Sequence, residues 1–261
     1  MTAPESMWRA RWRAARWSLV LWLLSATLTG VATWFWFPGV HYRIDGGLQG
    51  LRMVSLVDFI LGPVLFLIVY RPHKPARLLL LDLSLLLCVQ IAAMVWGIWR
   101  VHSQRPVADV YMLDAFYPTV AADYQRYGID PARLRRFSVQ DPPLLYLRLG
   151  QGKALRHVVH VVMVEGLPIY TQTELWQALA GQPDDPLVQG RAACLSWLQH
   201  AGQPVATELQ KRFGAPLTAH DYAWFQGRYG RALLVFDRHE RLQGSVLLGG
   251  AGARSLEQAH R

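Results

Sequence analysis

Three apolar runs, each about as long as a membrane-spanning helix, dominate the first hundred residues and limit what the chain can fold into. They cover residues 17–37, 51–70 and 78–99. At a rise of about 1.5 Å per residue, roughly 20 apolar residues cross the hydrocarbon core of a bilayer. We therefore expect an α-helical membrane domain of three transmembrane helices over residues 17–100. No clear small-x-small cleavage site follows the first run, so we expect an uncleaved helix rather than a signal peptide.

Basic residues collect before the first run and between the second and the third. Residues 1–16 form a basic N-terminus, and residues 71–77 form a basic loop. Their basic side chains are Arg9, Arg11, Arg13 and Arg16, followed by Arg71, Lys74 and Arg77. Because Lys and Arg favour the cytoplasmic side of a membrane, we expect a multi-pass protein of the bacterial inner membrane with its N-terminus in the cytoplasm. Everything after the third run then lies in the periplasm.

The basic balance of the chain comes mainly from this membrane part. Residues 1–100 hold ten Lys or Arg and four Asp or Glu, whereas residues 101–261 hold seventeen and fourteen. Because the basic clusters flank apolar runs, we expect anionic lipids at the cytoplasmic face as partners. We do not expect nucleic acid, since the sequence has no zinc-finger, RNA-binding or basic-zipper pattern.

Polar and small residues inside the second and third runs recur at helical spacing. The two stripes consist of Arg52, Ser55, Asp58 and Gly62 on the second helix, and of Gln90, Ala93 and Gly97 on the third. A carboxylate in hydrocarbon is costly and normally faces protein. Since Asp58 and Gln90 lie at similar depths, we expect Asp58 to bond to Gln90 or to a polar group on another protein's helix. The two stripes then form an intramembrane face that binds a partner.

A proton or ion pathway is a second interpretation of the same carboxylate. Such a pathway needs several titratable groups in series across the bilayer. The sequence offers only Asp58 and Asp82, at opposite depths. The partner-binding interpretation is therefore favoured over transport.

Other residues of this part are assigned a structural role. The glycines before the second run predict a tight external connection that lets the first two helices pack together, and Asp82 lies where Arg71 or Arg77 reaches it. On the first helix, a stripe of small residues either packs against another helix or faces lipid. The structural residues are Gly46, Gly47, Gly50, Pro63 and Asp82, and the stripe is Ser18, Ser25, Thr29 and Ala32.

Several of these residues resemble a family signature in their order and spacing. The matching segments are GGLQGLR at 46–52, VDFILGP at 57–63, then Lys74, Asp82, Gln90, Gly97 and Arg105-Pro106. They are similar to the N-terminal signature of the TfpX/TfpZ family of type IV pilin accessory proteins. The resemblance covers roughly residues 17–118 and implies three membrane helices, a variable external domain and the type IV major pilin as partner. Tyr111 departs from the more usual phenylalanine, which leaves the role of the external domain open.

The rest of the chain predicts a small α+β periplasmic domain over residues 101–249, with a flexible tail at 250–261. Strands are expected at 107–112, within 144–164 (notably VVHVVMV) and in a hairpin formed by 232–237 and the LQGSVLLGG that follows it. Helices are expected in the segments PTVAADYQRYG, DPARLRRF, TELWQALA, DPLVQGRAACLSWLQHAG and PVATELQKRFG, because caps, helical apolar spacing or glycine stops occur there.

Catalytic patterns are scarce in this domain. His157 and His160 fall on opposite faces of the predicted strand and belong to no HExxH or CxxC arrangement. The pairs His220-Asp221 and His239-Glu240 lie in expected turns, and no GxSxG elbow occurs. We therefore expect no enzyme, no cofactor and no metal. The two cysteines, Cys88 and Cys194, fall in different compartments, so an internal disulfide is not expected.

The leading hypothesis is an inner-membrane accessory protein of type IV pilus biogenesis that binds its cognate pilin in the membrane and modulates assembly. The external domain would contact the pilin's globular head. The alternative is a sensor or transporter subunit whose periplasmic domain binds a small ligand. A pilin-like reading frame beside the gene favours the first, and a neighbouring ATPase or kinase frame favours the second. A membrane enzyme acting through His157 or His160 is the third hypothesis.

Overall fold

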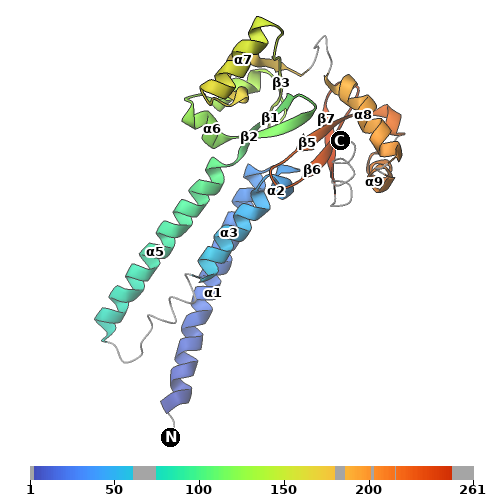
Figure 1. The fold of residues 1–261 in the computed structure, drawn as a ribbon. Coiled ribbons are helices and arrows are strands. Elements are labelled where there is room, and N and C mark those ends of the chain that lie inside the picture. The colour runs from blue at the N-terminus through green and yellow to red at the C-terminus, as the bar shows by residue number, and fades with distance from the viewer. Residues whose placement is uncertain (1–2, 61–74, 180–185, 201–202, 215, 249–261) are drawn as a thin grey trace. The chain divides into compact units, whose positions relative to one another are not determined.

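The chain divides into two compact units (Figure 1). The computed structural model describes residues 3–60, 75–179, 186–200, 203–214 and 216–248. The helical unit comprises Met1–Trp36 and Gly47–Ser103, and the sheet unit comprises Phe37–Gly46 and Gln104–Arg261. The connection between the first two helices therefore belongs to the sheet unit, whereas the division by apolar runs assigns residues 17–100 to one membrane domain.

Three helices make up the helical unit: α1 (Ala3–Trp36), α3 (Gly47–Phe59) and α5 (Ala76–Ser103). α1 packs along α3, and α5 contacts both. The first helix begins well before the apolar run at residue 17, since the basic stretch is helical as well. The second begins at Gly47, so two of the three glycines expected in a connection, Gly47 and Gly50, lie inside α3.

The prediction of three transmembrane helices is wrong. Among the residues described, only Arg77–Ser103 forms a helix both long and apolar enough to cross a membrane. The described part of the second run lies in the 13 residues of α3, which extend about 20 Å. In α1, Thr29 and Thr33 are buried, so one side of that helix packs against protein. The apolar composition of the run does not distinguish a side of the helix that packs against protein from a side that faces lipid. The remainder of the second run, residues 61–70, lies outside the described residues.

One mixed seven-stranded sheet forms the sheet unit, in the order β4-β3-β1-β2-β5-β6-β7. A central hairpin pairs β1 with β2, β3 runs parallel to β1, β5 runs parallel to β2, and the outer pairs are antiparallel. The prediction of a small α+β domain is therefore wrong, because the unit is built on a seven-stranded sheet. The strands are β1 (Pro106–Met112), β2 (Ala115–Val120), β3 (Leu144–Leu147), β4 (Trp176–Ala178), β5 (Asp221–Gln226), β6 (Arg231–Phe236) and β7 (Leu242–Leu247).

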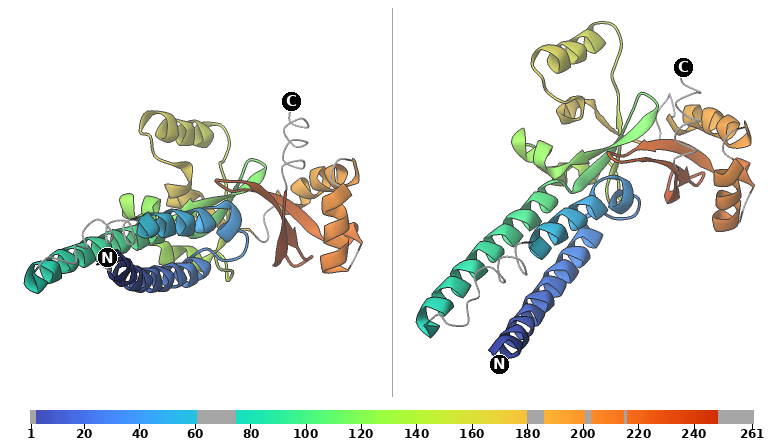
Figure 2. Two further views of the ribbon diagram at one scale, coloured as in Figure 1. Left: turned by 90° about the horizontal axis from the view of Figure 1, so that it is seen from below. Right: turned by 60° about the horizontal axis from the view of Figure 1, so that its bottom comes forward.

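The helices of the sheet unit are short. They are α2 (His41–Ile44), α6 (Ala121–Arg126), α7 (Lys153–Val164), α8 (Pro186–His200) and α9 (Gln203–Phe213). Single 3-10 turns occur at Pro131–Arg136, Ile169–Thr171, Thr173–Leu175 and Leu217–Ala219. In both views of Figure 2, α7 projects away from the sheet, whereas α8 and α9 lie beside β5, β6 and β7.

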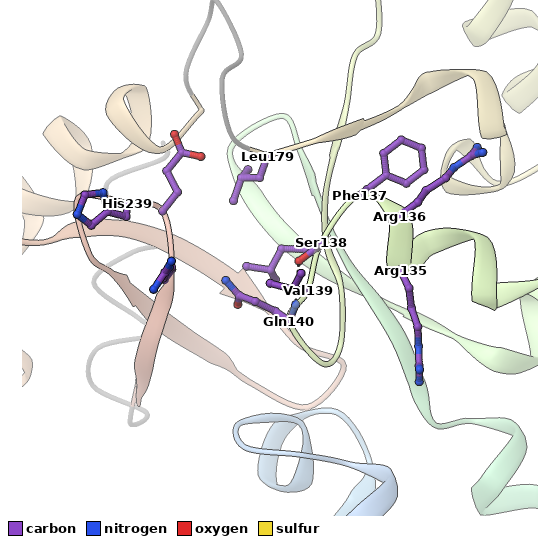
Figure 3. A pocket seen from close by; sticks show the side chains of 11 residues that line it. Arg135, Arg136, Phe137, Ser138, Val139, Gln140, Leu179 and His239 are labelled. Carbon is purple, nitrogen blue, oxygen red and sulfur yellow. Dashed lines mark hydrogen bonds between the residues drawn. The ribbon is translucent and has the colours of Figure 1, made fainter.

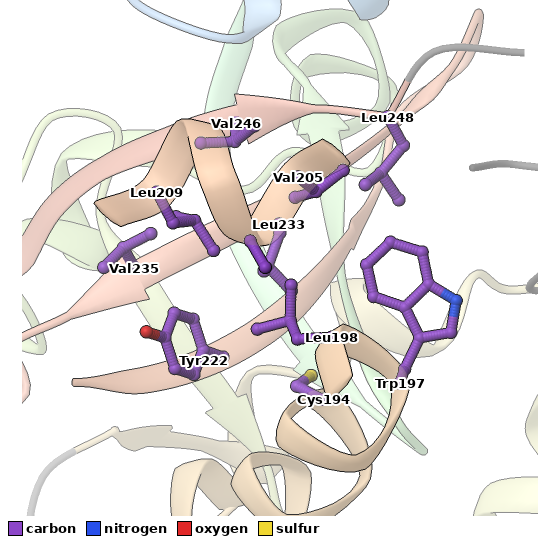
Figure 4. Close-up of a cluster of buried hydrophobic side chains, with 11 residues drawn as sticks. Cys194, Trp197, Leu198, Val205, Leu209, Tyr222, Leu233, Val235, Val246 and Leu248 are labelled. Atoms are coloured by element: carbon purple, nitrogen blue, oxygen red, sulfur yellow. The ribbon is translucent and has the colours of Figure 1, made fainter. Parts of the chain in front are cut away.

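Strand β6 is covered on both faces. On one face, Leu233 and Val235 join the core formed with α8 and α9 (Figure 4). On the other face, Leu234 and Phe236 pack in a cluster that includes Phe116. A strand buried on both faces is apolar without alternation, which explains the continuous ALLVF segment of β6.

Several local predictions are confirmed, and two are wrong. The strand at 107–112, the hairpin of β6 and β7, and the helices α8 and α9 occur as expected. The Asp130 carboxylate accepts a hydrogen bond from the backbone N–H of Ala132 at 2.9 Å and caps the following turn. The VVHVVMV segment, however, forms the second half of α7, and TELWQALA forms a 3-10 turn and β4. The β-branched composition of α7 suggested a strand, but Val158 and Val161 are the residues it buries, one turn apart as in a helix.

Candidate functional site

Helices α1 and α3 are joined by polar contacts inside the helical unit. The Ser25 hydroxyl donates a hydrogen bond to Asp58 Oδ2 at 2.5 Å. One turn earlier on each helix, the indole Nε1 of Trp22 donates to the carbonyl of Ser55 at 2.8 Å. The Trp22 ring also meets Phe59 edge-on, with 5.3 Å between ring centroids. The carboxylate expected to bond to Gln90 or to an incoming helix is therefore bonded to α1.

Helices α3 and α5 touch through two glycines. A Cβ on Gly97 would lie 3.2 Å from Val54 Cγ2, and a Cβ on Gly50 would lie 3.1 Å from Val101 Cγ2. Both distances are tighter than ordinary carbon contacts. The small residues thus let the two backbones approach closely, as small residues do between apolar helices.

The other residues of the predicted partner-binding face differ in burial, and one of them lies outside the described residues. Gln90 and Ala93 lie with Gly97 on the half-buried side of α5, as expected, whereas Arg52 is exposed and points away from the packed side of α3. Asp82 is half-buried near the start of α5. Gly62 and Pro63 lie outside the described residues. The small stripe of the first helix packs against protein at Ser25 and Thr29.

The segment between α1 and α3 is held inside the sheet unit. Phe37, His41, Ile44 and Asp45 are all buried. The backbone N–H of Tyr229, in the β5–β6 turn, donates a hydrogen bond to the carbonyl of Ile44 at 2.8 Å. We call residues 37–46 the connector.

Two glycines of the same β5–β6 turn make room for the connector. A Cβ on Gly227 would lie 2.7 Å from the Ile44 carbonyl oxygen, and one on Gly230 would lie 3.0 Å from Ile44 Cγ2. Any side chain at Gly227 would therefore push the connector away from the sheet. Gly46, with a φ of 115°, ends the connector in a conformation that glycine adopts readily.

A buried imidazole between two carboxylates fixes the connector to the central strand. His41 Nε2 lies 3.1 Å from Oδ2 of Asp109 on β1, and His41 Nδ1 lies 3.4 Å from Oδ2 of Asp45. The ring also meets Phe225 edge-on at 5.1 Å. Burial lowers the pKa of His41, but the carboxylates of Asp109 and Asp45 outweigh burial and raise that pKa to about 9. Burial raises the pKa of Asp109, and the His41 charge opposes the rise. We call these three residues the His41 cluster.

The His41 cluster suits a structural ion pair and not a catalyst. All three side chains are buried, so no substrate reaches them in this conformation. Within the described residues, no group of three or more His, Cys, Asp or Glu side chains could hold a metal ion. Breaking such a contact is costly, because the partner that remains is a buried charge without compensation.

A cavity of about 310 Å³ opens on the sheet unit between the loop after Arg136 and the β6–β7 turn (Figure 3). The side chains of Arg135 and His239 point away from its centre, and Arg136 lies over the Phe137 ring at 4.8 Å. The polar groups do not converge on a common point, as they would in a ligand site.

The other histidines and the cysteines show no catalytic arrangement among the described residues. His157 and His160 are exposed on α7, one turn apart on a helix rather than on opposite faces of a strand. Cys194 is fully buried, and burial raises the pKa of its thiol, which makes it unreactive at neutral pH. Cys88 is exposed on α5.

Known proteins supply the remaining observation. No family profile and no solved structure matches the chain. The fimbrial assembly protein of serogroups C1 and C2 from Dichelobacter nodosus is 32% identical over 106 residues, which are 39% of this chain and 81% of that protein. The chain belongs to the family of fimbrial assembly proteins.

Two longer matches agree with this assignment. The fimbrial assembly protein of D. nodosus serogroup I is 27% identical over 207 residues, 76% of this chain and 80% of that protein. The one from serogroup E1 is 29% identical over 201 residues, 74% and 77% of the two chains. The resemblance to pilin accessory proteins is thus supported at the level of fimbrial assembly, whereas the narrower TfpX/TfpZ label is not.

In this fimbrial assembly protein, the sequence reasoning missed the His41 cluster. A signal was present, because His41 and Asp45 stand four residues apart in a short connection with Phe37 and Ile44. Apolar and titratable residues together in a connection indicate burial rather than a solvated loop. The partner, Asp109, is 68 positions away along the chain, so only the fold identifies it.

Proposed function

We propose that this fimbrial assembly protein serves type IV fimbriae, lies in the bacterial inner membrane and binds its own fimbrial subunit. The observation that carries the proposal is the similarity to the D. nodosus fimbrial assembly proteins, two of which match about three quarters of the chain. The type IV assignment is supported by the resemblance of residues 46–63 to pilin accessory proteins. The relatives' names each specify one or two serogroups, which supports a protein dedicated to particular fimbrial variants.

Helix α5 supports the membrane location. Large apolar side chains are exposed along its length, including Leu80, Leu85, Trp96 and Trp99. Exposing them to water would be unfavourable, whereas a bilayer accepts them. The aromatic residues near the end of the helix suit the interfacial region, and Arg100 follows them. In this proposal the sheet unit lies in the periplasm.

Subunit binding in the membrane would use the half-buried side of α5. The Ser25 to Asp58 bond already joins α1 to α3, which leaves Gln90 and Ala93 as the polar and small residues proposed to contact an incoming helix. A small residue permits close approach, and a polar contact between apolar helices contributes roughly 0.6 to 2 kcal/mol. Such a contact selects a partner without holding it permanently.

Two experiments test the proposal. Deletion of the gene is expected to remove or reduce surface fimbriae, and the wild-type gene is expected to restore them. Unchanged fimbriae in the deletion strain would contradict the assembly role. For the intramembrane contact, Ala93→Leu is expected to reduce the amount of subunit that co-purifies in detergent, whereas Ala92→Leu, on the exposed side of the same helix, is the matched control. Equal recovery with both variants would contradict a contact at Ala93.

The alternative of a ligand-binding sensor or transporter subunit has no comparable support. Its expected feature is a periplasmic cavity with converging polar groups. The cavity in Figure 3 lacks that convergence among the described residues. The similarity to fimbrial assembly proteins therefore favours the fimbrial hypothesis.

A further inference from the structure

A smaller cavity of the sheet unit, of about 90 Å³, lies where β2 and β5 run side by side. Ala115 and Phe225 are the buried residues that line it. Trp224 lines it as well, and the Trp224 ring meets Trp197 of α8 edge-on, with 5.1 Å between ring centroids. This contact fixes the indole, so the cavity has one rigid aromatic wall.

The cavity lies between two buried clusters on one face of the sheet. Residues opposite each other on paired strands share a face, and such pairs join Val110 to Tyr117, Ala115 to Trp224, and Trp224 to Leu233. Tyr117 also shares a face with Ala115, two residues before it. Val110 belongs to one cluster, and Leu233 belongs to the cluster formed with α8 and α9. The space is therefore bounded by sheet strands and not by a loop.

Opposite charges line this space without pairing. Arg231 Nε donates a hydrogen bond to Gln226 Oε1, which orients the guanidinium. Asp114 lines the same cavity, yet no ion pair joins it to Arg231, and neither its carboxylate nor the terminal N–H groups of Arg231 have a hydrogen-bond partner among the described residues. The cavity thus offers donors and an acceptor that a ligand can use together.

The Tyr117 hydroxyl adds a further donor. Burial and the Asp114 carboxylate raise the pKa of Tyr117, and the Arg231 charge opposes the rise. The phenol therefore keeps its proton at neutral pH and can donate a hydrogen bond. A carboxylate suits the donors Arg231 and Tyr117, and an N–H group beside that carboxylate suits Asp114.

The size of the cavity restricts the ligand further. Sites that enclose a small molecule have volumes of roughly 300 to 1,000 Å³, whereas this cavity has about 90 Å³. Asp114 is exposed in the β1–β2 turn, so the space opens to solvent at the acceptor. A ligand whose carboxylate lies inside can therefore continue outward past Asp114. The last residue of a polypeptide has this chemistry, because its carboxylate is followed at once by a backbone N–H.

We propose that the cavity between β2 and β5 binds the C-terminal residue of a partner polypeptide. Arg231 and Tyr117 bind the α-carboxylate, Asp114 accepts a hydrogen bond from the backbone N–H, and Trp224 packs against a small apolar side chain. Proteins use capture of a C-terminal carboxylate as a mode of peptide recognition. The site lies within the sheet unit and goes beyond the proposed function, since it does not depend on binding of the fimbrial subunit.

The test measures binding of three probes to the purified full chain in detergent by isothermal titration calorimetry. The probes are the peptide Ala-Ala-Ala with a free C-terminus, the same peptide with a C-terminal amide, and free alanine. The variants are Arg231→Gln and Asp114→Ala. Arg238→Gln is the matched control, because Arg238 is exposed in the β6–β7 turn and does not line the cavity. Thermal unfolding checks that each variant folds, and the comparison of the two peptides needs no variant.

The free-acid peptide is expected to bind the wild-type chain and Arg238→Gln equally, and to bind Arg231→Gln and Asp114→Ala about tenfold more weakly or worse. The amidated peptide is expected to bind the wild-type chain about tenfold more weakly than the free acid. Equal binding of the two peptides would overturn the proposal, and so would unchanged binding of the free acid by a folded Arg231→Gln variant. Binding of free alanine without binding of the peptide would assign the cavity to a free amino acid and overturn the proposal. Absence of binding by every probe at millimolar concentration would overturn it as well.

Discussion

His41 Nε2 lies 3.1 Å from Asp109 Oδ2, although the two residues are 68 positions apart in the chain. The contact joins the connector to the central strand β1, and both groups are buried. The connector is also the covalent link between α1 and α3, so the His41 cluster holds this link within the sheet unit.

Replacement of His41 is expected to destabilise the sheet unit strongly. His41→Ala leaves the carboxylates of Asp109 and Asp45 buried without their cation, and breaking a buried ion pair costs about 3 to 5 kcal/mol. Thermal unfolding followed by circular dichroism measures the change. His157→Ala, on the exposed side of α7, is expected to stay within about 0.5 kcal/mol of wild type. Equal unfolding temperatures for the two variants would contradict the assigned role.

The stability of the sheet unit is expected to fall as the pH rises above neutrality. The pKa of His41 is raised from 6.5 to about 9 in the folded protein by Asp109 and Asp45, which outweigh burial. Because the folded state holds this proton more tightly, the stabilisation is complete below pH 6.5 and is lost as the pH rises through about 9. This protonation of His41 contributes about 3 kcal/mol to the free energy of unfolding.

Unfolding midpoints measured from pH 6 to pH 10 test this dependence. The wild-type midpoint should decline over that range, and the decline should be much smaller in His41→Ala. A wild-type midpoint that stays constant would show that the imidazole is not held as a cation.

The sequence predicts the elements of the sheet unit better than the helical unit and the connector. The strands at 107–112 and 232–237 are predictable because their apolar residues and turns are local signals. α7 was misassigned because its Val-rich composition favours strands, whereas the burial of Val158 and Val161 depends on tertiary packing. The number of membrane helices was overestimated because an apolar run does not fix the length and hydropathy of the helix that contains it, and among the described residues only Arg77–Ser103 is long and apolar enough.

The bond between Ser25 and Asp58 is expected to contribute measurably to the pairing of α1 with α3. Ser25→Ala and Asp58→Ala each remove one partner, and a typical intramolecular hydrogen bond contributes about 0.5 to 1.5 kcal/mol to stability. In a double-mutant cycle, the loss in the double variant should be smaller than the sum of the single losses. Additive losses, measured by thermal unfolding in detergent, would show that the two side chains do not interact.

Close packing at Gly97 is expected to control how α3 meets α5. Gly97→Leu introduces a side chain where even a Cβ would lie 3.2 Å from Val54. The variant should unfold at a lower temperature in detergent, with a loss of about 1 to 3 kcal/mol for an overpacked contact. Val54→Ala opens space at the same point and should restore part of the loss in the double variant. No rescue would indicate that the two residues are not in contact.

The proposed binding of the fimbrial subunit can be tested directly by cross-linking in native membranes and purification of the tagged full chain. We expect the fimbrial subunit to be recovered cross-linked to the wild-type chain, and in smaller amount with Ala93→Leu. Recovery of intact, folded protein without any subunit would contradict it.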